Sequence, residues 1–171
     1  FLGPRIAFLE GELAARGFSG FPWVRITEIM YHPELSDTLE FVEFTNTEST
    51  TVDVSGWYVT LVDFEFPSGS VIPANATVVL ARDAASFFFE YGSVADFGSY
   101  SGKLINSGGD LRLMDGRPGL LSGTLDQFPA QHPVTIDSVF YRDQSPWPVT
   151  ADGFGTSLEL RHLSYDNDFD E

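Results

Sequence analysis

Short runs of β-branched and aromatic residues fill most of this sequence, and turn-forming residues interrupt them about every ten positions. Runs of this length and spacing are typical of antiparallel strands that are joined by turns. The sequence therefore predicts an all-β fold, either a sandwich or a barrel. The runs lie at residues 24–31, 39–46, 51–54, 57–66, 70–72, 77–82, 110–114, 134–141 and 156–163.

The first segment departs from this pattern and predicts a helix. Ile6, Leu9 and Leu13 recur at helical spacing after Pro4, and Gly17 can end the helix. The residues that follow, up to 23, then form a linker into the body of the domain.

A second helical segment follows Asp83, which can cap a helix, and ends at Gly92. It contains three consecutive phenylalanines, at positions 87–89. Because a helix has about 3.6 residues per turn, these three side chains cannot all face the same way. We expect at least one of them to contact another element or another molecule.

The length of 171 residues fits one domain, and a hydrophobic fraction of 43% is sufficient for a core. We expect three parts: an N-terminal helix and linker at 1–23, a β-sandwich at 24–163 and an acidic segment at 164–171. Because the sequence begins at Phe1, we also expect it to be a piece of a longer protein.

The charge is strongly unbalanced, with 25 acidic residues against 9 basic ones and a net charge of -16. Binding to a phosphate backbone depends on clustered Lys and Arg, so we expect no nucleic acid partner. The absence of cysteine removes disulfide frameworks and thiolate zinc sites. No stretch approaches the roughly 20 apolar residues of a membrane span, so we predict none.

Several motifs follow one another between residues 24 and 163. They are two strands at 26–33 and 40–46, a turn at 53–57, an asparagine–glycine–aspartate signature at 104–113, and the segments 137–141, 147–148 and 155–160. In this order they resemble the lamin tail domain of bacterial extracellular proteins. The resemblance implies an immunoglobulin-like sandwich of two packed sheets.

Within these motifs we expect structural roles for Glu28, Glu43, Gly56, Trp57, Asn106, Asp110 and Trp147. Two features depart from the family that the motifs resemble. The connection at 117–133 is longer than the family's short turn, and the chain lacks the tryptophan-containing segment that often follows position 168.

Glu28 and Glu43 lie on neighbouring predicted strands and suggest a carboxylate pair for acid–base chemistry. The better interpretation is structural, because half-buried glutamates commonly accept hydrogen bonds that fix a strand end. Asn106 and Asp110 flank a serine–glycine–glycine turn, where their side chains can bond nearby backbone amides.

Asp166, Asp168 and Asp170 alternate along the C-terminal segment and suggest a calcium site, because calcium prefers oxygen ligands. The glycine and the final glutamate of an EF-hand loop are missing, so a solvated acidic tail is the favoured alternative. Calcium is the one cofactor that the sequence suggests.

Other chemistries find little support. His32, His132 and His162 are scattered, and neither a serine elbow nor a phosphate loop is present. Trp23, Trp57 and Trp147 could stack on a sugar, which would make the chain a carbohydrate-binding module. Two of these tryptophans coincide with motif positions that most simply fill the core.

We therefore predict a non-catalytic interaction or assembly module of a secreted or cell-surface protein, possibly one that self-associates into a filament. A carbohydrate-binding module is the first alternative, and a calcium-dependent hydrolase that uses Glu28, Glu43 or Asp110 is the second. A lamin-like nuclear role is a third, which the acidic charge disfavours. The residues predicted to make the intermolecular contacts are Ile6, Phe8, Leu9, Leu13, Leu120, Leu121, Leu125 and Phe128. These residues could instead cover the edges of the sandwich itself.

Overall fold

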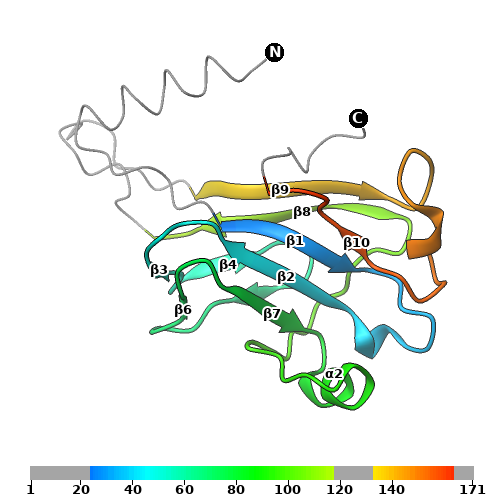
Figure 1. The fold of residues 1–171 in the computed structure, drawn as a ribbon, viewed down its shortest axis with the longest axis horizontal. Coiled ribbons are helices and arrows are strands. Elements are labelled where there is room, and N and C mark those ends of the chain that lie inside the picture. The colour runs from blue at the N-terminus through cyan, green and yellow to red at the C-terminus, as the bar shows by residue number, and fades with distance from the viewer. Residues whose placement is uncertain (1–23, 118–132, 164–171) are drawn as a thin grey trace.

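The computed structural model describes residues 24–117 and 133–163, which form two stacked β-sheets with a few short helical segments (Figure 1). The helix predicted within residues 1–23 lies outside the described residues. The same is true of most of the long connection and of the acidic C-terminal segment.

The first sheet, which we call the β1 sheet, has the strand order β10-β1-β2-β7, and the second, the β8 sheet, has the order β5-β4-β8-β9. All pairings in both sheets are antiparallel. A small ribbon pairs β3 with β6. The bounds are β1 Val24–Met30, β2 Phe41–Asn46, β3 Val52–Asp53, β4 Trp57–Val59, β5 Phe64–Glu65, β6 Val71–Ile72, β7 Thr77–Ala81, β8 Gly108–Asp115, β9 Val134–Arg142 and β10 Leu158–Glu159.

The core lies between the two sheets. Alternate residues of each strand point inward, as the pleat of a β-strand dictates, so that Val42 and Phe44 of β2 join Leu111 and Leu113 of β8 in one buried cluster. The fully buried Trp57 is the largest side chain of this core. The prediction of an immunoglobulin-like β-sandwich is confirmed.

The internal helix, α2 (Ala84–Tyr91), forms where the sequence predicts it. The Asp83 side chain accepts a hydrogen bond from the Ser86 backbone N–H, and Gly92 ends the helix with a φ of 70°. That left-handed conformation favours glycine, which has no Cβ to clash. Two short 3-10 helices, η1 (Asp37–Leu39) and η2 (Val149–Ala151), complete the helical content of the described residues.

α2 covers one end of the outer face of the β1 sheet, near the bottom of Figure 1. Its Phe87 is only 5% exposed and meets Phe41 edge to face, with the ring centroids 5.4 Å apart. Phe88 and Phe89 point away and are 49% and 85% exposed. The three phenylalanines thus divide between the sandwich and the surface, as helical geometry requires.

One predicted strand is interrupted. The run at 57–66 contains two short strands, β4 and β5, because the chain turns at residues 60–63. Leu61 and Asp63 adopt φ values of 64° and 54° in this turn, a conformation that non-glycine residues seldom take. A run of β-forming residues alone does not reveal such a turn.

The free edge of β7 is covered by the segment that follows α2. The Ala81 N–H donates to the carbonyl of Phe97, and the Phe97 N–H donates to the carbonyl of Val79. The Val79 N–H donates in turn to the Asp96 carboxylate at 2.9 Å. Strand addition at this edge is therefore opposed by the chain itself.

The part of β1 that does not pair with β10 is covered in a similar way. Its Ile26 N–H donates to the Asp137 carboxylate at 2.7 Å, and Arg25 pairs with the same carboxylate at 3.2 Å. Asp137 belongs to β9, so this contact links the two sheets. Within residues 24–117 and 133–163, no helix is long and apolar enough to cross a membrane.

Candidate functional site

Three glutamates form a row across the outer face of the β1 sheet. Glu28 of β1 lies directly opposite Glu159 of β10 and directly opposite Glu43 of β2. Directly opposed side chains on a sheet have Cβ atoms about 5 Å apart, so these carboxylates repel one another. We call this group the glutamate row.

Three threonine hydroxyl groups, joined by hydrogen bonds, lead to the carboxylate of Glu43 in the glutamate row. The Thr27 hydroxyl donates to Glu43 Oε1 at 2.8 Å and lies 3.0 Å from the Thr45 hydroxyl, which lies 2.9 Å from that of Thr77. Because Thr27 gives its single proton to the carboxylate, Thr45 must donate to Thr27, and Thr77 to Thr45. This relay stabilises negative charge on Glu43.

Burial nevertheless dominates, and it raises the pKa of Glu43 above its usual value of 4.5; the charges of Glu28 and Glu159 raise it further, against the Thr27 hydrogen bond. Glu28 accepts a hydrogen bond from the Ser157 hydroxyl. The row therefore resembles an acid–base pair in residue type, but its described partners are hydroxyl groups that fix the strands.

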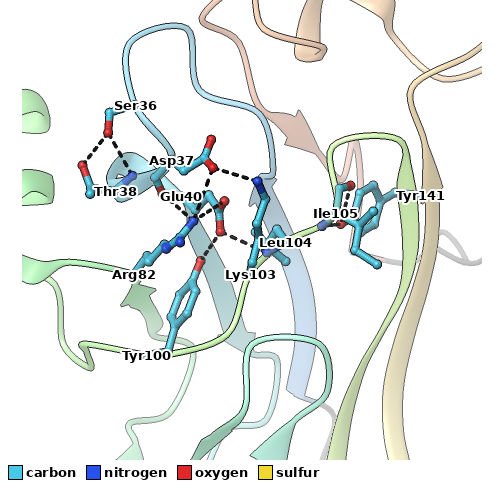
Figure 2. Close-up of polar contacts among 10 residues, drawn as sticks. All are labelled: Ser36, Asp37, Thr38, Glu40, Arg82, Tyr100, Lys103, Leu104, Ile105 and Tyr141. Atoms are coloured by element: carbon cyan, nitrogen blue, oxygen red, sulfur yellow. Dashed lines mark hydrogen bonds and ion pairs between the residues drawn. The ribbon is translucent and has the colours of Figure 1, made fainter.

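A second carboxylate centre lies at the start of β2, where Glu40 is fully buried. Its Oε1 pairs with Arg82 at 2.8 Å, and its Oε2 accepts from the Leu104 backbone N–H at 3.0 Å and from the Tyr100 hydroxyl at 3.3 Å (Figure 2). Figure 2 shows the three donors converging on one carboxylate from two segments, one that carries Arg82 and one that carries both Tyr100 and Leu104. We call Glu40 and these partners the Glu40 centre.

The electrostatics of this centre reflect its burial. Desolvation raises the pKa of Glu40, while the Leu104 N–H and the Arg82 guanidinium act in the opposite direction. Desolvation also raises the pKa of Tyr100, with the Glu40 charge adding to the effect, so the phenol keeps its proton and acts as a donor. A carboxylate with three donors and no access to solvent holds segments together rather than reaching a substrate.

Solvent-exposed charges flank the Glu40 centre. Asp37 pairs with Lys103 at 2.8 Å and with Arg82 at 3.7 Å. The Lys103 hydrogen bond is the main reason that the pKa of Asp37 lies below its usual value. Arg82 thus bridges a buried carboxylate and an exposed one.

The structure places Asp110 on the outer face of the β8 sheet, so the core separates it from the glutamate row. Its carboxylate accepts from Arg112 Nε at 2.9 and 3.0 Å, whereas the sequence suggested a bond to a nearby backbone amide. The reason is the two-residue spacing, which puts Arg112 on the same face of β8. Asn106 Oδ1 is buried and has no hydrogen-bond partner among the described residues.

Gly56 and the two motif tryptophans serve the fold. Gly56 has a φ of 72° in the turn before β4, and the backbone N–H of Trp57 donates to the carbonyl of Val54. Trp57 has no exposed surface, and Trp147 packs against the core while partly buried. Trp57 therefore offers no open face to a sugar ring.

Several predicted residues lie outside the described ranges, and so their predictions stand as made. They are Trp23 and His132, the calcium candidates Asp166, Asp168 and Asp170, and the contact residues Ile6, Phe8, Leu9, Leu13, Leu120, Leu121, Leu125 and Phe128. In the part of the chain that the structure describes, no group of three or more His, Cys, Asp or Glu side chains could hold a metal ion.

Sequence reasoning missed the Glu40 centre. Glu40 lies within the predicted strand at 39–46, just before the observed β2, and its partners Arg82, Tyr100 and Leu104 follow 42, 60 and 64 residues later. No local pattern joins such distant positions. The one available signal was an acidic residue next to an apolar strand, which many exposed glutamates share.

The family model of the Lamin Tail Domain matches residues 19–127, which is more than half of the chain. Comparison with curated proteins and with solved structures finds no match. The matched range ends before β9 and β10, yet both strands pair within the same two sheets.

Proposed function

The chain belongs to the lamin tail domain family, and from this premise we propose that it is a non-catalytic interaction and assembly module of a secreted or cell-surface protein. Domains of this family are immunoglobulin-like and generally non-catalytic. The proposal includes self-association into a larger structure as its most specific form.

The observation that carries the proposal is that described residues already cover two edges of the β1 sheet, that of β7 and that of β1 where β10 does not pair with it. Phe97 and Asp96 cover β7, and Asp137 covers the start of β1. The apolar residues predicted as contacts at 6–13 and 120–128 are therefore not needed at those edges. Bulky apolar side chains that are not needed to cover these edges favour contact with another molecule.

The carboxylates that an enzyme would need also support a non-catalytic role. Glu28 and Glu43 lie on one outer face, while Asp110 lies on the opposite one and is held by Arg112. A hydrolase that uses all three would need them in one cleft. The hydrogen-bond partners of these carboxylates fix the strands. Among the described residues, the three carboxylates are not placed to act together on one substrate.

The carbohydrate-binding alternative depends on exposed aromatic faces. Trp57 contributes none, which weakens this alternative relative to a protein contact. A panel of immobilised glycans distinguishes the two: selective, saturable sugar binding would favour the alternative over the assembly role.

The assembly role is tested by light scattering and electron microscopy of the purified chain, with and without calcium. We expect oligomers that grow with concentration, and we expect Leu121→Asp combined with Leu125→Asp to leave only monomer, because a charge cannot be buried in an apolar contact. Val149→Asp is the matched control, since Val149 is 59% exposed on η2 and should tolerate the change.

Two results would count against the proposal. One is a wild-type chain that stays monomeric at high concentration in both conditions. The other is a double variant that assembles as well as the Val149→Asp control. If EDTA alone dissolves the oligomers, the calcium prediction for Asp166, Asp168 and Asp170 becomes part of the assembly mechanism.

A further inference from the structure

The outward side of α2, together with the residues that follow it, carries an exposed apolar surface. Phe89 is 85% exposed, Val94 77% and Phe88 49%. Phe88 and Phe89 also contact each other, with their ring centroids 6.0 Å apart. We call these three residues the α2 face.

Local geometry explains why these side chains are not buried. Phe87 and Tyr91 both contact Phe41, so this side of the helix is already used to pack on the β1 sheet. The neighbouring residues Phe88 and Phe89 must then point elsewhere. Exposed aromatic residues that cluster on one helix mark a contact surface more often than an accident of packing.

All the charged residues of the segment that carries the α2 face are acidic. Between residues 83 and 102 the sequence contains Asp83, Glu90 and Asp96 and no lysine or arginine. The two basic residues that border this segment, Arg82 and Lys103, are paired with Glu40 and Asp37. The basic side chains nearest in sequence therefore already form ion pairs with carboxylates outside this segment.

The helix itself adds to the negative potential. The last turn of α2 contains no basic residue, so nothing in that turn offsets the partial negative charge of its terminal carbonyl groups. Glu90 lies in the same turn as Phe88 and Phe89. Apolar anchors and negative charge therefore coincide at one helix end.

We propose that the α2 face binds a cationic, apolar segment of a partner protein, in which bulky apolar residues pack on Phe88 and Phe89 while Lys or Arg side chains lie near Glu90. A second copy of this chain is disfavoured at this face, because two acidic surfaces would repel. An anionic lipid surface is disfavoured for the same reason. The inference names a surface and a partner chemistry for the interaction role, and so it rests on the proposed function.

The test uses the full chain and two helical peptides with identical leucine spacing. One peptide carries lysine at the other positions, and the second carries glutamate. Binding is measured by calorimetry, and the contact site by NMR chemical shift changes. We expect the lysine peptide to bind and to shift the signals of α2, with an affinity that falls as salt is added.

Three variants locate the binding. Phe88→Ser with Phe89→Ser should weaken the lysine peptide about tenfold or more, as loss of central aromatic anchors does. Glu90→Lys should weaken it a few-fold and reduce the salt dependence. Phe154→Ser is the matched control, because Phe154 is 73% exposed in a distant part of the sequence, and it should bind like wild type.

Equal binding of both peptides, or a phenylalanine variant that binds like the control, would overturn the inference. So would shifts confined to the glutamate row, or binding to neutral lipid vesicles that the phenylalanine variant loses while neither peptide binds. Light scattering of the same samples keeps this result separate from the proposed function. If the chain assembles normally and the lysine peptide fails to bind, only the α2 inference is lost.

Discussion

Glu40 lies just before strand β2, and Glu43 of the glutamate row lies in the middle of the same strand. The two glutamates nevertheless have very different surroundings. Glu40 is completely buried and meets three donors, among them Arg82 at 2.8 Å. Glu43 is half-buried and lies directly opposite another glutamate, Glu28. Burial raises the pKa of both.

The difference lies in what surrounds each carboxylate. At Glu40, three donors from two segments compensate for lost hydration, so the group holds the fold together. At Glu43, hydroxyl groups compensate only in part, and like charges add a penalty. A raised pKa therefore has a structural explanation at both places, and neither place requires catalysis.

The largest effect that this comparison predicts is that of Glu40→Ala. The substitution leaves Arg82 beside an apolar gap and the Leu104 N–H without its acceptor. We expect the free energy of unfolding to fall by about 3–5 kcal/mol, the usual cost of removing one partner of a buried ion pair. Urea unfolding gives this value.

The exposed Glu34 supplies the matched control for this experiment. Glu34→Ala should change the free energy of unfolding by less than about 0.5 kcal/mol. If the two variants lost equal stability, Glu40 would not be the structural centre that its contacts indicate.

A smaller effect of opposite sign is expected for Glu43→Gln. Glutamine can still accept from Thr27 but carries no charge, so repulsion from Glu28 and Glu159 disappears. Near neutral pH we expect a gain of about 0.2–1 kcal/mol, the range for cross-strand pairs. Chemical unfolding of both chains over a range of pH values measures the difference.

The pH dependence fixes the sign of this effect. A folded-state pKa above the usual 4.5 means that Glu43 favours folding when protonated and loses that contribution as the pH rises through its folded pKa. The advantage of Glu43→Gln should therefore vanish below about pH 4.5 and grow as the pH rises through the folded-state pKa of Glu43. An advantage that persists in acid would contradict the repulsion argument.

The smallest predicted effect belongs to Lys103→Ala, which removes the exposed partner of Asp37. Lys103 is 50% exposed, so the pair should contribute only about 0.2–0.5 kcal/mol to the free energy of unfolding, and less in high salt. Thermal unfolding at two salt concentrations tests this. A loss of unfolding free energy as large as that of Glu40→Ala would show that the exposed Lys103–Asp37 pair contributes as much to stability as the buried Glu40 centre.

The sequence predicted what depends on local patterns. Short β-branched and aromatic runs separated by turn residues predicted the sandwich, and Asp83 and Gly92 predicted both ends of α2, because capping is a property of a few adjacent residues. The same logic failed at residues 60–63, where Leu61 and Asp63 take a conformation that their identities disfavour. Contacts made later in the chain hold that turn, since Gly102 and Lys103 donate to its carbonyls.

The candidate site was harder to predict because it depends on long-range contacts. Glu28 and Glu43 could be paired from their neighbouring strands, whereas Glu159 joins the row only through β10, which is more than a hundred residues away. Asp110 was expected to bond a backbone amide, but Arg112 on the same face of the strand takes its place. Side-chain partners across a fold follow from topology, which sequence alone leaves open.

We propose that this lamin tail domain acts through contacts with other molecules and that its sandwich is a scaffold. Sedimentation velocity of the wild-type chain over a wide concentration range, beside Leu121→Asp with Leu125→Asp, tests it most directly. We predict a mass that rises with concentration for the wild type and a constant monomer for the double variant. A constant monomer for both, or the same rise for both, would contradict the claim.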